Sequence, residues 1–237
     1  MTITLLCLFF AALITSMISG TIGMAGGVLL LSAMTFFISI DVIVPIHGMV
    51  QLASNSTRFF LLRKHLRKNL ITSFSIGVPI GALGSTYLIT KIDQKQYFFI
   101  AIAFIIFFAL FKPKKVKFNL PDNLFILIGI AVGFLGLFVG ATGPFIAPFF
   151  LNSKFTKEEV VANKAAVQAI GHLVKIPAFL TLGFNYQSHL ILIILLIIGT
   201  FIGTHLGVKL LGKINERVFT IFFKTALFFS ALRLLLQ

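Results

Sequence analysis

The sequence predicts an all-α polytopic membrane protein built from two inverted structural repeats. Hydrophobic residues make up 58% of the 237 positions and charged residues only 11%, with a mean hydropathy of +1.06. A soluble domain carries about a quarter charged residues. Apolar runs of roughly 18–20 residues recur along the chain, each long enough to cross a hydrocarbon core of ~30 Å, and the second half repeats the pattern of the first. We therefore expect the bilayer to be the solvent for nearly all of the chain.

The apolar stretches give the predicted helical elements in order. They fall at about 3–20, 21–38, 43–62, 70–90, 96–111, 123–140, 141–151, 160–182, 188–208 and 218–236. The first stretch lacks the basic region of a cleavable signal, so we expect it to remain as a membrane segment. The single cysteine, Cys7, excludes an intramolecular disulfide and a cysteine-based metal cluster.

Glycine interrupts the apolar sequence at two corresponding places. Residues 3–40 form one run that is too long for a single helix and is broken at 20–27, and residues 123–151 are broken in the same way at 140–144. Because glycine permits positive φ and proline lacks a donor, both places should break a helix inside the membrane. Pro144 suits the first turn of a restarting helix. Each half should then begin with a glycine-broken, re-entrant hairpin followed by about three transmembrane helices.

The internal repeat is the strongest feature of the sequence. A shift of 117 positions places Gly23 and Gly26 on glycines, and it matches the polar helix that follows each glycine cluster. The matched pairs are Gly23 with Gly140, Gly26 with Gly143, Gln51 with Gln168, Asn55 with His172 and Arg58 with Lys175. We therefore divide the chain into a first transmembrane repeat (1–112), a basic cytoplasmic linker (113–121) and a second transmembrane repeat (122–237). A shift of 122 places Gly77 and Gly81 on Gly199 and Gly203, as in motifs that pack membrane helices closely.

Loop charge indicates that the repeats are inverted. The net charge is +14, and the basic residues gather in short loops, which favours retention of these loops in the cytoplasm over nucleic-acid binding. In the first half, the loop near 38–46 has no Lys or Arg while 63–69 has four. In the second half the order is reversed, since 152–164 holds Lys154, Lys157 and Lys164 while 183–188 holds none. Corresponding loops should therefore lie on opposite sides of the membrane.

Each glycine cluster is followed by a helix with one polar face. His47, Gln51, Asn55 and Arg58 are spaced 4, 4 and 3 apart, and Lys164, Gln168, His172 and Lys175 have the same spacing. An unpaired polar group in lipid costs several kcal/mol, so both faces should point toward protein, water or substrate. The alternative is that they form hydrogen bonds between helices, with Arg58 and Lys175 snorkelling to the nearer interface.

The charges inside the predicted membrane segments are basic. All six acidic residues fall at predicted segment ends, and Asp41 and Glu158 resemble helix-start residues after Ser39 and Thr156. A helix that restarts in the membrane offers free N–H groups, which favour an anion. The ligand should therefore be anionic, and His47 and His172 are the candidates for proton coupling. No enzyme signature, metal motif or cofactor motif is visible, so we expect no catalytic residues, no metal and no cofactor.

The residues resemble the sulfite exporter TauE/SafE-like family of membrane carriers over essentially the whole chain. The resemblance is carried by the glycine clusters at 20–27 and 140–144, and by Lys164-Ala-Ala-Val-Gln168 with His172 four residues further on. The first cluster departs from a fuller glycine pattern at Met24-Ala25. The resemblance implies an all-helical carrier in the bacterial plasma (inner) membrane for sulfite, sulfonates or other small organic anions.

We therefore expect a secondary transporter that works by alternating access, with small anions and membrane lipid as its partners and no nucleic acid. The two glycine breaks and the two polar faces would enclose the substrate. The expected binding residues are Gly23, Gly26, Gly27, Gln51, Asn55, Arg58, Gly140, Gly143, Gln168, His172 and Lys175. An anion channel and a non-transporting membrane subunit are the alternatives.

Overall fold

The computed structural model describes residues 2–88, 96–111, 120–150 and 155–235. Within these ranges the chain is helical and contains no strand. Four helical segments among them are long and apolar enough to cross a membrane: Ile3–Ile22, Lys68–Leu88, Asp122–Val139 and Gln187–Leu211. The predicted all-α class is confirmed. The predicted linker 113–121 lies outside the described residues except for its last two positions.

The helices follow the predicted apolar stretches. The first half forms α1 (Thr2–Ile22), α2 (Gly26–Met34), α3 (Ile40–Leu61), α4 (Lys68–Leu88) and α5 (Gln96–Phe111). The second half forms α6 (Phe125–Val139), α7 (Gly143–Ile146), α8 (Lys157–Leu173), α9 (Lys175–Thr181), α10 (Leu190–Leu211) and α11 (Glu216–Leu235). The predicted stretch 160–182 is divided into α8 and α9 because Pro177 cannot donate the hydrogen bond that would continue α8 past its end.

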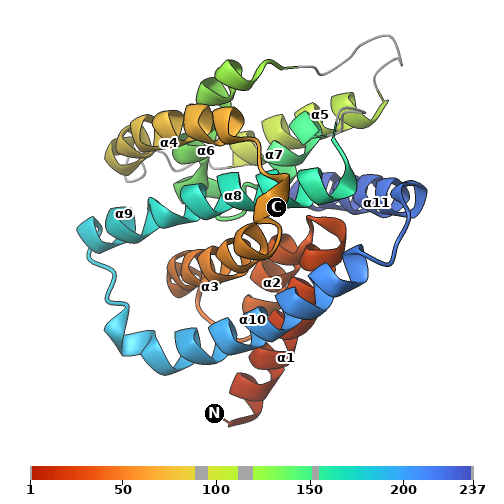
Figure 1. Ribbon diagram of the computed structural model, residues 1–237. Helices are drawn as coiled ribbons and strands as arrows, with labels where there is room; N and C mark the ends of the chain where they lie inside the picture. Colours follow the sequence, from red (N-terminus) through yellow and green to blue (C-terminus); the bar gives the residue numbers. More distant parts are fainter. Residues whose placement is uncertain (1, 89–95, 112–119, 151–154, 236–237) are drawn as a thin grey trace.

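The two halves are interleaved rather than side by side. In Figure 1, α1, α2, α3 and α10 form one group and α4, α5, α6 and α7 form another, with α8 and α9 running between them. Helix α1 packs along α10, and α4 packs along α6, so the helix that opens each half lies on a long helix of the other half. Helix α8 contacts α3 in the first group as well as α4 and α6 in the second. The polar helices α3 and α8 therefore meet at the centre of the molecule.

Glycine allows the two long helix pairs to approach closely. A Cβ atom added at Gly81 would collide with the backbone carbonyl of Ile130 in α6, and one added at Gly203 would collide with that of Leu13 in α1. The same holds for the other glycines of these stripes, Gly77, Gly199 and Gly207. The predicted packing role of the Gly77/Gly81 and Gly199/Gly203 motifs is confirmed, and these contacts fix how the two halves interlock.

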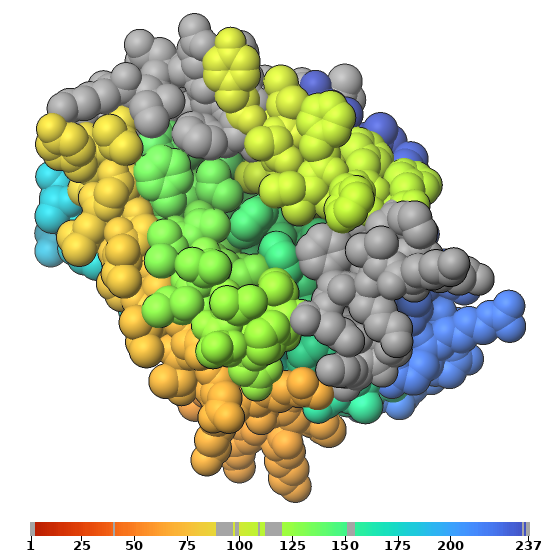
Figure 2. Space-filling model, turned by 90° about the horizontal axis from the view of Figure 1, so that it is seen from above, coloured from red at the N-terminus to blue at the C-terminus, as the bar shows by residue number. Residues whose placement is uncertain are grey.

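One face of the molecule, seen in Figure 2, is made by α4, α6 and α5 lying side by side. Large apolar side chains are exposed on these helices, among them Ile80, Leu83, Phe104, Phe108 and Leu127. Large exposed apolar side chains on neighbouring helices are unfavourable in water but suit contact with lipid. The exposed surface therefore agrees with a chain that is embedded in the bilayer.

Three segments with basic residues meet at one end of the molecule, which we call the basic end. It comprises the connection 62–67, the start of α8 and the turn between α10 and α11. Lys157 Nζ donates to the carbonyls of Leu211 and Ile214, at 2.7 Å each, and Arg67 Nε lies 3.7 Å from Glu159 Oε1. The expectation that these segments share one side of the membrane agrees with these contacts.

The opposite end, which we call the apolar end, comprises the start of α3 and the connection 182–189. Phe184 and Tyr186 from this connection pack against a buried cluster that contains Ile43 and Ile46 of α3. One residue used to predict the loop charges is corrected by the structure. Lys164 is not a loop residue, because it lies inside α8 and is only 1% exposed.

The close glycine contacts give a first testable prediction. Gly81→Ala should lower the stability by about 1–3 kcal/mol, because its Cβ would meet the backbone of α6, which cannot move aside as a side chain can. Gly84→Ala is the matched control, since its Cβ would meet only a side-chain atom of Phe134 at 3.9 Å in the same helix. Thermal unfolding of the two purified variants in detergent measures the difference, and equal midpoints would contradict the packing role.

Candidate functional site

Both predicted helix breaks are present. Helix α1 ends at Ile22, and Gly23 and Ala25 have φ values of 82° and 70° before α2 begins. Helix α6 ends at Val139, and Gly140 has a φ of 72° before α7 begins with Pro144 in its first turn. Ala25 departs from the fuller glycine pattern and still takes a conformation that suits glycine. Such a conformation costs on the order of 1–3 kcal/mol for a residue with a Cβ.

A small cavity lies between the two breaks and is lined by both polar helices. The first half contributes Gly27, His47 and Gln51, and the second half contributes Gly143, Lys164, Gln168 and His172. The space open to water has a volume of about 10 Å³. This is close to what one water molecule needs, so the cavity is narrow in this conformation.

Two histidines face each other across this cavity. The ring centroids of His47 and His172 are 6.0 Å apart, with an angle of 75° between the planes. His47 Nε2 lies 2.8 Å from the carbonyl oxygen of Gly27. The Nδ1 atoms of both rings are buried, and neither has a hydrogen-bond partner in the described part of the chain. Buried polar atoms of this kind are normally satisfied, so a water or a ligand would complete the site.

Three cations are buried around the cavity, and their partners are neutral groups. Arg58, Lys164 and Lys175 are each exposed by no more than 2%. Lys164 Nζ donates to the carbonyl of Gly23 and to Gln168 Oε1, at 2.9 Å each. Lys175 Nζ donates to the carbonyl of Gly140. None of the three forms an ion pair with an acidic residue that the structure describes.

Arg58 occupies the position in the first half that Lys175 occupies in the second. Its guanidinium donates to the carbonyl of Ser19 at 3.2 Å and to Asn55 Oδ1 at 2.8 Å. Ser19 and Gly140 lie at the carboxyl ends of α1 and α6, where unpaired carbonyls attract cations. Arg58 and Lys175 are therefore turned inward to the helix breaks, and the alternative that they snorkel to the interface is wrong in this conformation.

The acidic residues that the structure describes lie away from the cavity. Asp41, Glu158, Glu159 and Glu216 are in the first turns of their helices, as expected. Thr156 accepts a hydrogen bond from the backbone of Glu159, and the Glu159 side chain accepts one from the backbone of Thr156, which together cap α8. Asp93 lies outside the described residues. The local charge at the cavity is therefore positive.

The structure does not bring all expected binding residues to the cavity. Gly23, Asn55 and Arg58 lie behind its wall, as do Gly26, Gly140 and Lys175. Gly26 faces α1, where an added Cβ would collide with the carbonyl of Thr15. Asn55 Nδ2 donates to the carbonyl of Gln51 one turn earlier in its own helix. These residues hold the breaks and the polar faces in place.

Lys164 lines the cavity but is not among the binding residues expected from the sequence. It lies on the predicted polar face of its helix. Its amino group reaches the cavity beside Gln168. The repeat carried the signal, since Lys164 occupies the position that corresponds to His47, which also lines the cavity.

Neighbouring glycines allow packing and binding to be separated. Gly26→Ala should lower the stability by about 1–3 kcal/mol, because its Cβ would meet the backbone of α1. Gly27→Ala should unfold near the wild-type temperature, since its Cβ would meet Gln51 Oε1 at 3.3 Å, and that flexible side chain can shift. The thermal midpoints of the two purified variants check this. Equal losses would show that Gly27 also serves packing.

Comparison with known proteins agrees with the geometry. The family model described as Sulfite exporter TauE/SafE matches residues 8–234, which is nearly the whole chain. No curated protein and no solved structure matches the chain in the corresponding searches. This chain belongs to the sulfite exporter TauE/SafE family and is a multi-pass membrane protein.

Proposed function

We propose that the chain is a secondary transporter for small organic or sulfur-containing anions of the sulfite and sulfonate class, working by alternating access. The observation that carries the proposal is the set of three buried cations with only neutral partners around a cavity shared by both halves. Taking an ion out of water costs several kcal/mol, so unneutralised buried cations need a function to explain them. An anion in the cavity would offset their charge.

The contacts suggest how an oxyanion is held. Lys164 Nζ donates a hydrogen bond to the amide oxygen of Gln168, so the amide nitrogen of Gln168 can donate to a ligand. This nitrogen lies beside Gly143, where an added Cβ would approach it to 2.9 Å, so the glycine keeps the space open. In the first half Gln51, which corresponds to Gln168, faces Gly27. The two amides and Lys164 would together supply charge-assisted hydrogen bonds to the oxygens of the anion.

The small volume of the cavity favours a carrier over an open channel. A site of about 10 Å³ holds one water molecule and cannot hold an ion with a central sulfur and three oxygens. The substrate would enter only when the walls separate. Since the two halves contribute opposite walls, a movement of one half against the other would open the site, as alternating access requires.

Several contacts support inverted repeats as the frame for this movement. The pairing of α1 with α10 corresponds to the pairing of α6 with α4, as expected for a two-fold relation between the halves. The connection after α3 lies at the basic end, while its counterpart after α9 lies at the apolar end. We place the repeats at 1–112 and 122–237, treat the broken segments as re-entrant hairpins, and assign the protein to the bacterial plasma (inner) membrane.

The paired glutamines give the central test. Gln51→Leu with Gln168→Leu should reduce uptake of the anion into proteoliposomes by about 100-fold or more without loss of expression, because two donors to a buried oxyanion would be lost. Gln187→Leu is the matched control, since Gln187 is exposed in the connection before α10. Unchanged uptake in the double variant would overturn the assignment of the site.

The substrate class is tested by thermal shift of the purified protein with sulfite, thiosulfate, sulfoacetate and simple carboxylates. We expect stabilisation by one class of anion that is lost in the double glutamine variant. Flux that does not saturate would favour a channel instead. Absence of both binding and flux would favour a non-transporting membrane subunit.

The facing histidines are the candidates for proton coupling. If a proton accompanies the anion, His47→Gln or His172→Gln should make uptake independent of an imposed pH gradient while anion binding persists, because both rings face the cavity and an imidazole nitrogen can bind and release a proton. Uptake by both variants that still follows the pH gradient would exclude the histidines as proton carriers.

A further inference from the structure

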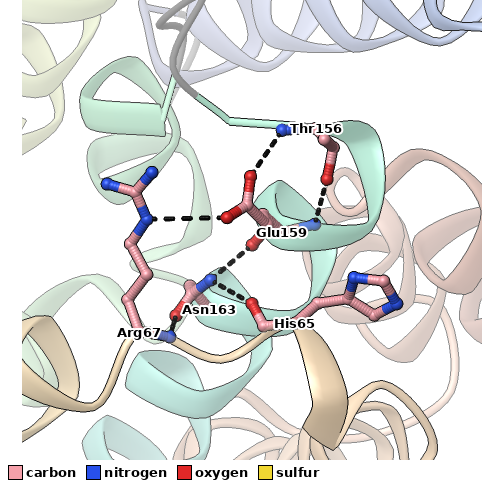
Figure 3. A network of polar contacts seen from close by, with 5 residues as sticks. All are labelled: His65, Arg67, Thr156, Glu159 and Asn163. Atoms are coloured by element: carbon pink, nitrogen blue, oxygen red, sulfur yellow. Dashed lines mark hydrogen bonds and ion pairs between the residues drawn. The ribbon is translucent and has the colours of Figure 1, made fainter.

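A polar clasp joins the two halves at the basic end (Figure 3). Its residues are His65 and Arg67 from the connection after α3, and Thr156, Glu159 and Asn163 from α8 and its cap. Arg67 Nε lies 3.7 Å from Glu159 Oε1, and its guanidinium lies 4.2 Å from the centre of the Phe155 ring. The first half is thus bound to the second through side chains that are partly open to water.

Asn163 is the centre of this clasp. Its Oδ1 accepts from the backbone N–H of Arg67 at 2.7 Å, and its Nδ2 donates to the carbonyl of His65 at 2.9 Å. Nδ2 also donates to the carbonyl of Glu159 at 2.8 Å. The side chain is completely buried, so one amide satisfies two backbone groups of the facing connection that would otherwise be unpaired.

The clasp and the proposed binding residues are neighbours in α8. Asn163 and Lys164 are consecutive in α8, so one points to the connection while the other points to the cavity, where it holds the carbonyl of Gly23. Val161, which lies between Glu159 and Asn163 in α8, faces Gly23, since a Cβ added at Gly23 would approach the Val161 side chain to 3.0 Å. A movement of this part of α8 would therefore change the clasp and the first helix break together.

The apolar end has no corresponding clasp among the described residues. The positions in α3 that match Asn163 and Glu159 are Ile46 and Val42, which pack in an apolar cluster with Phe184 and Tyr186. Opening this contact would expose apolar surface to water, whereas water can replace the hydrogen bonds of the clasp. The two ends are therefore closed by interactions of different kinds.

We propose that Arg67, Glu159 and Asn163 form the gate that closes the cavity at the basic end, and that Asn163 is the residue that holds it shut. The apolar contact at the other end closes the second access route. This inference rests on the proposed carrier function, which says that the substance passing the gate is an anion. The closure itself can be measured without any substrate.

The test measures the access of water-soluble reagents to the cavity from each side. Cys7 is replaced by serine, and Ser19→Cys places a thiol in the cavity lining. A membrane-impermeant methanethiosulfonate reagent is applied without substrate to inside-out vesicles and to spheroplasts. Asn163→Ala in this background should raise the labelling rate from the side of the basic end by about tenfold or more, with no change from the other side.

Two further variants make the outcome decisive. Asn185→Ala is the matched control, because its Oδ1 accepts from the backbone of Gln187 within its own exposed connection, and labelling should stay at the background rate. Glu159→Gln removes the ion pair with Arg67 while its amide oxygen can still cap Thr156, so it should raise labelling from the basic side less than Asn163→Ala does. Glu159→Gln also tests the gate if Asn163→Ala fails to fold.

Labelling at the background rate in both clasp variants would overturn the gate, and so would an equal rise from both sides, which indicates general loosening. Saturable uptake of an anion combined with unchanged labelling would contradict the gate alone. Side-specific labelling in a protein that moves no anion would support the gate and contradict the carrier function.

Discussion

The attraction between buried cations and the carbonyl ends of two broken helices organises the centre of this protein. Arg58, Lys164 and Lys175 lie in a region without a described carboxylate, and they bind the carbonyls of Ser19, Gly23 and Gly140. A continuous helix would bind these carbonyls to its own N–H groups, so the breaks are what make them available. The partial negative charge there stabilises the cations only in part. The remaining positive charge is what an anionic substrate would meet.

The close contacts between α1 and α10 and between α4 and α6 place these breaks near each other. Backbone carbonyls of one helix occupy the positions where residues other than glycine would carry a Cβ atom. Since each pair joins one half to the other, neither half can form its packing alone. This interlocking brings the polar helices α3 and α8 together, and it places Gln51 and Gln168 around one cavity although they are far apart in the chain.

The same arrangement separates the cavity from the two ends by contacts of different chemistry. Hydrogen bonds and one ion pair close the basic end, whereas aromatic and aliphatic side chains close the apolar end. The cavity between them has a volume of about 10 Å³, so it has room for about one water molecule in this conformation. Because Glu159 and Asn163 precede Lys164 in α8, the contacts at the basic end and the cavity share a rigid element.

The sequence by itself determined the features that depend on local pattern. The composition indicated a membrane protein, and the glycine clusters located both helix breaks. The spacing of His47, Gln51 and Asn55 placed them on one helical face, because a helix has a regular period. Whether Arg58 points inward or to the interface was open in the sequence, since both orientations suit a long side chain. Only the tertiary structure decided this, together with the position of Lys164 at the cavity and the clasp around Asn163. These features depend on contacts between residues that are far apart in the chain, which the helical period does not encode.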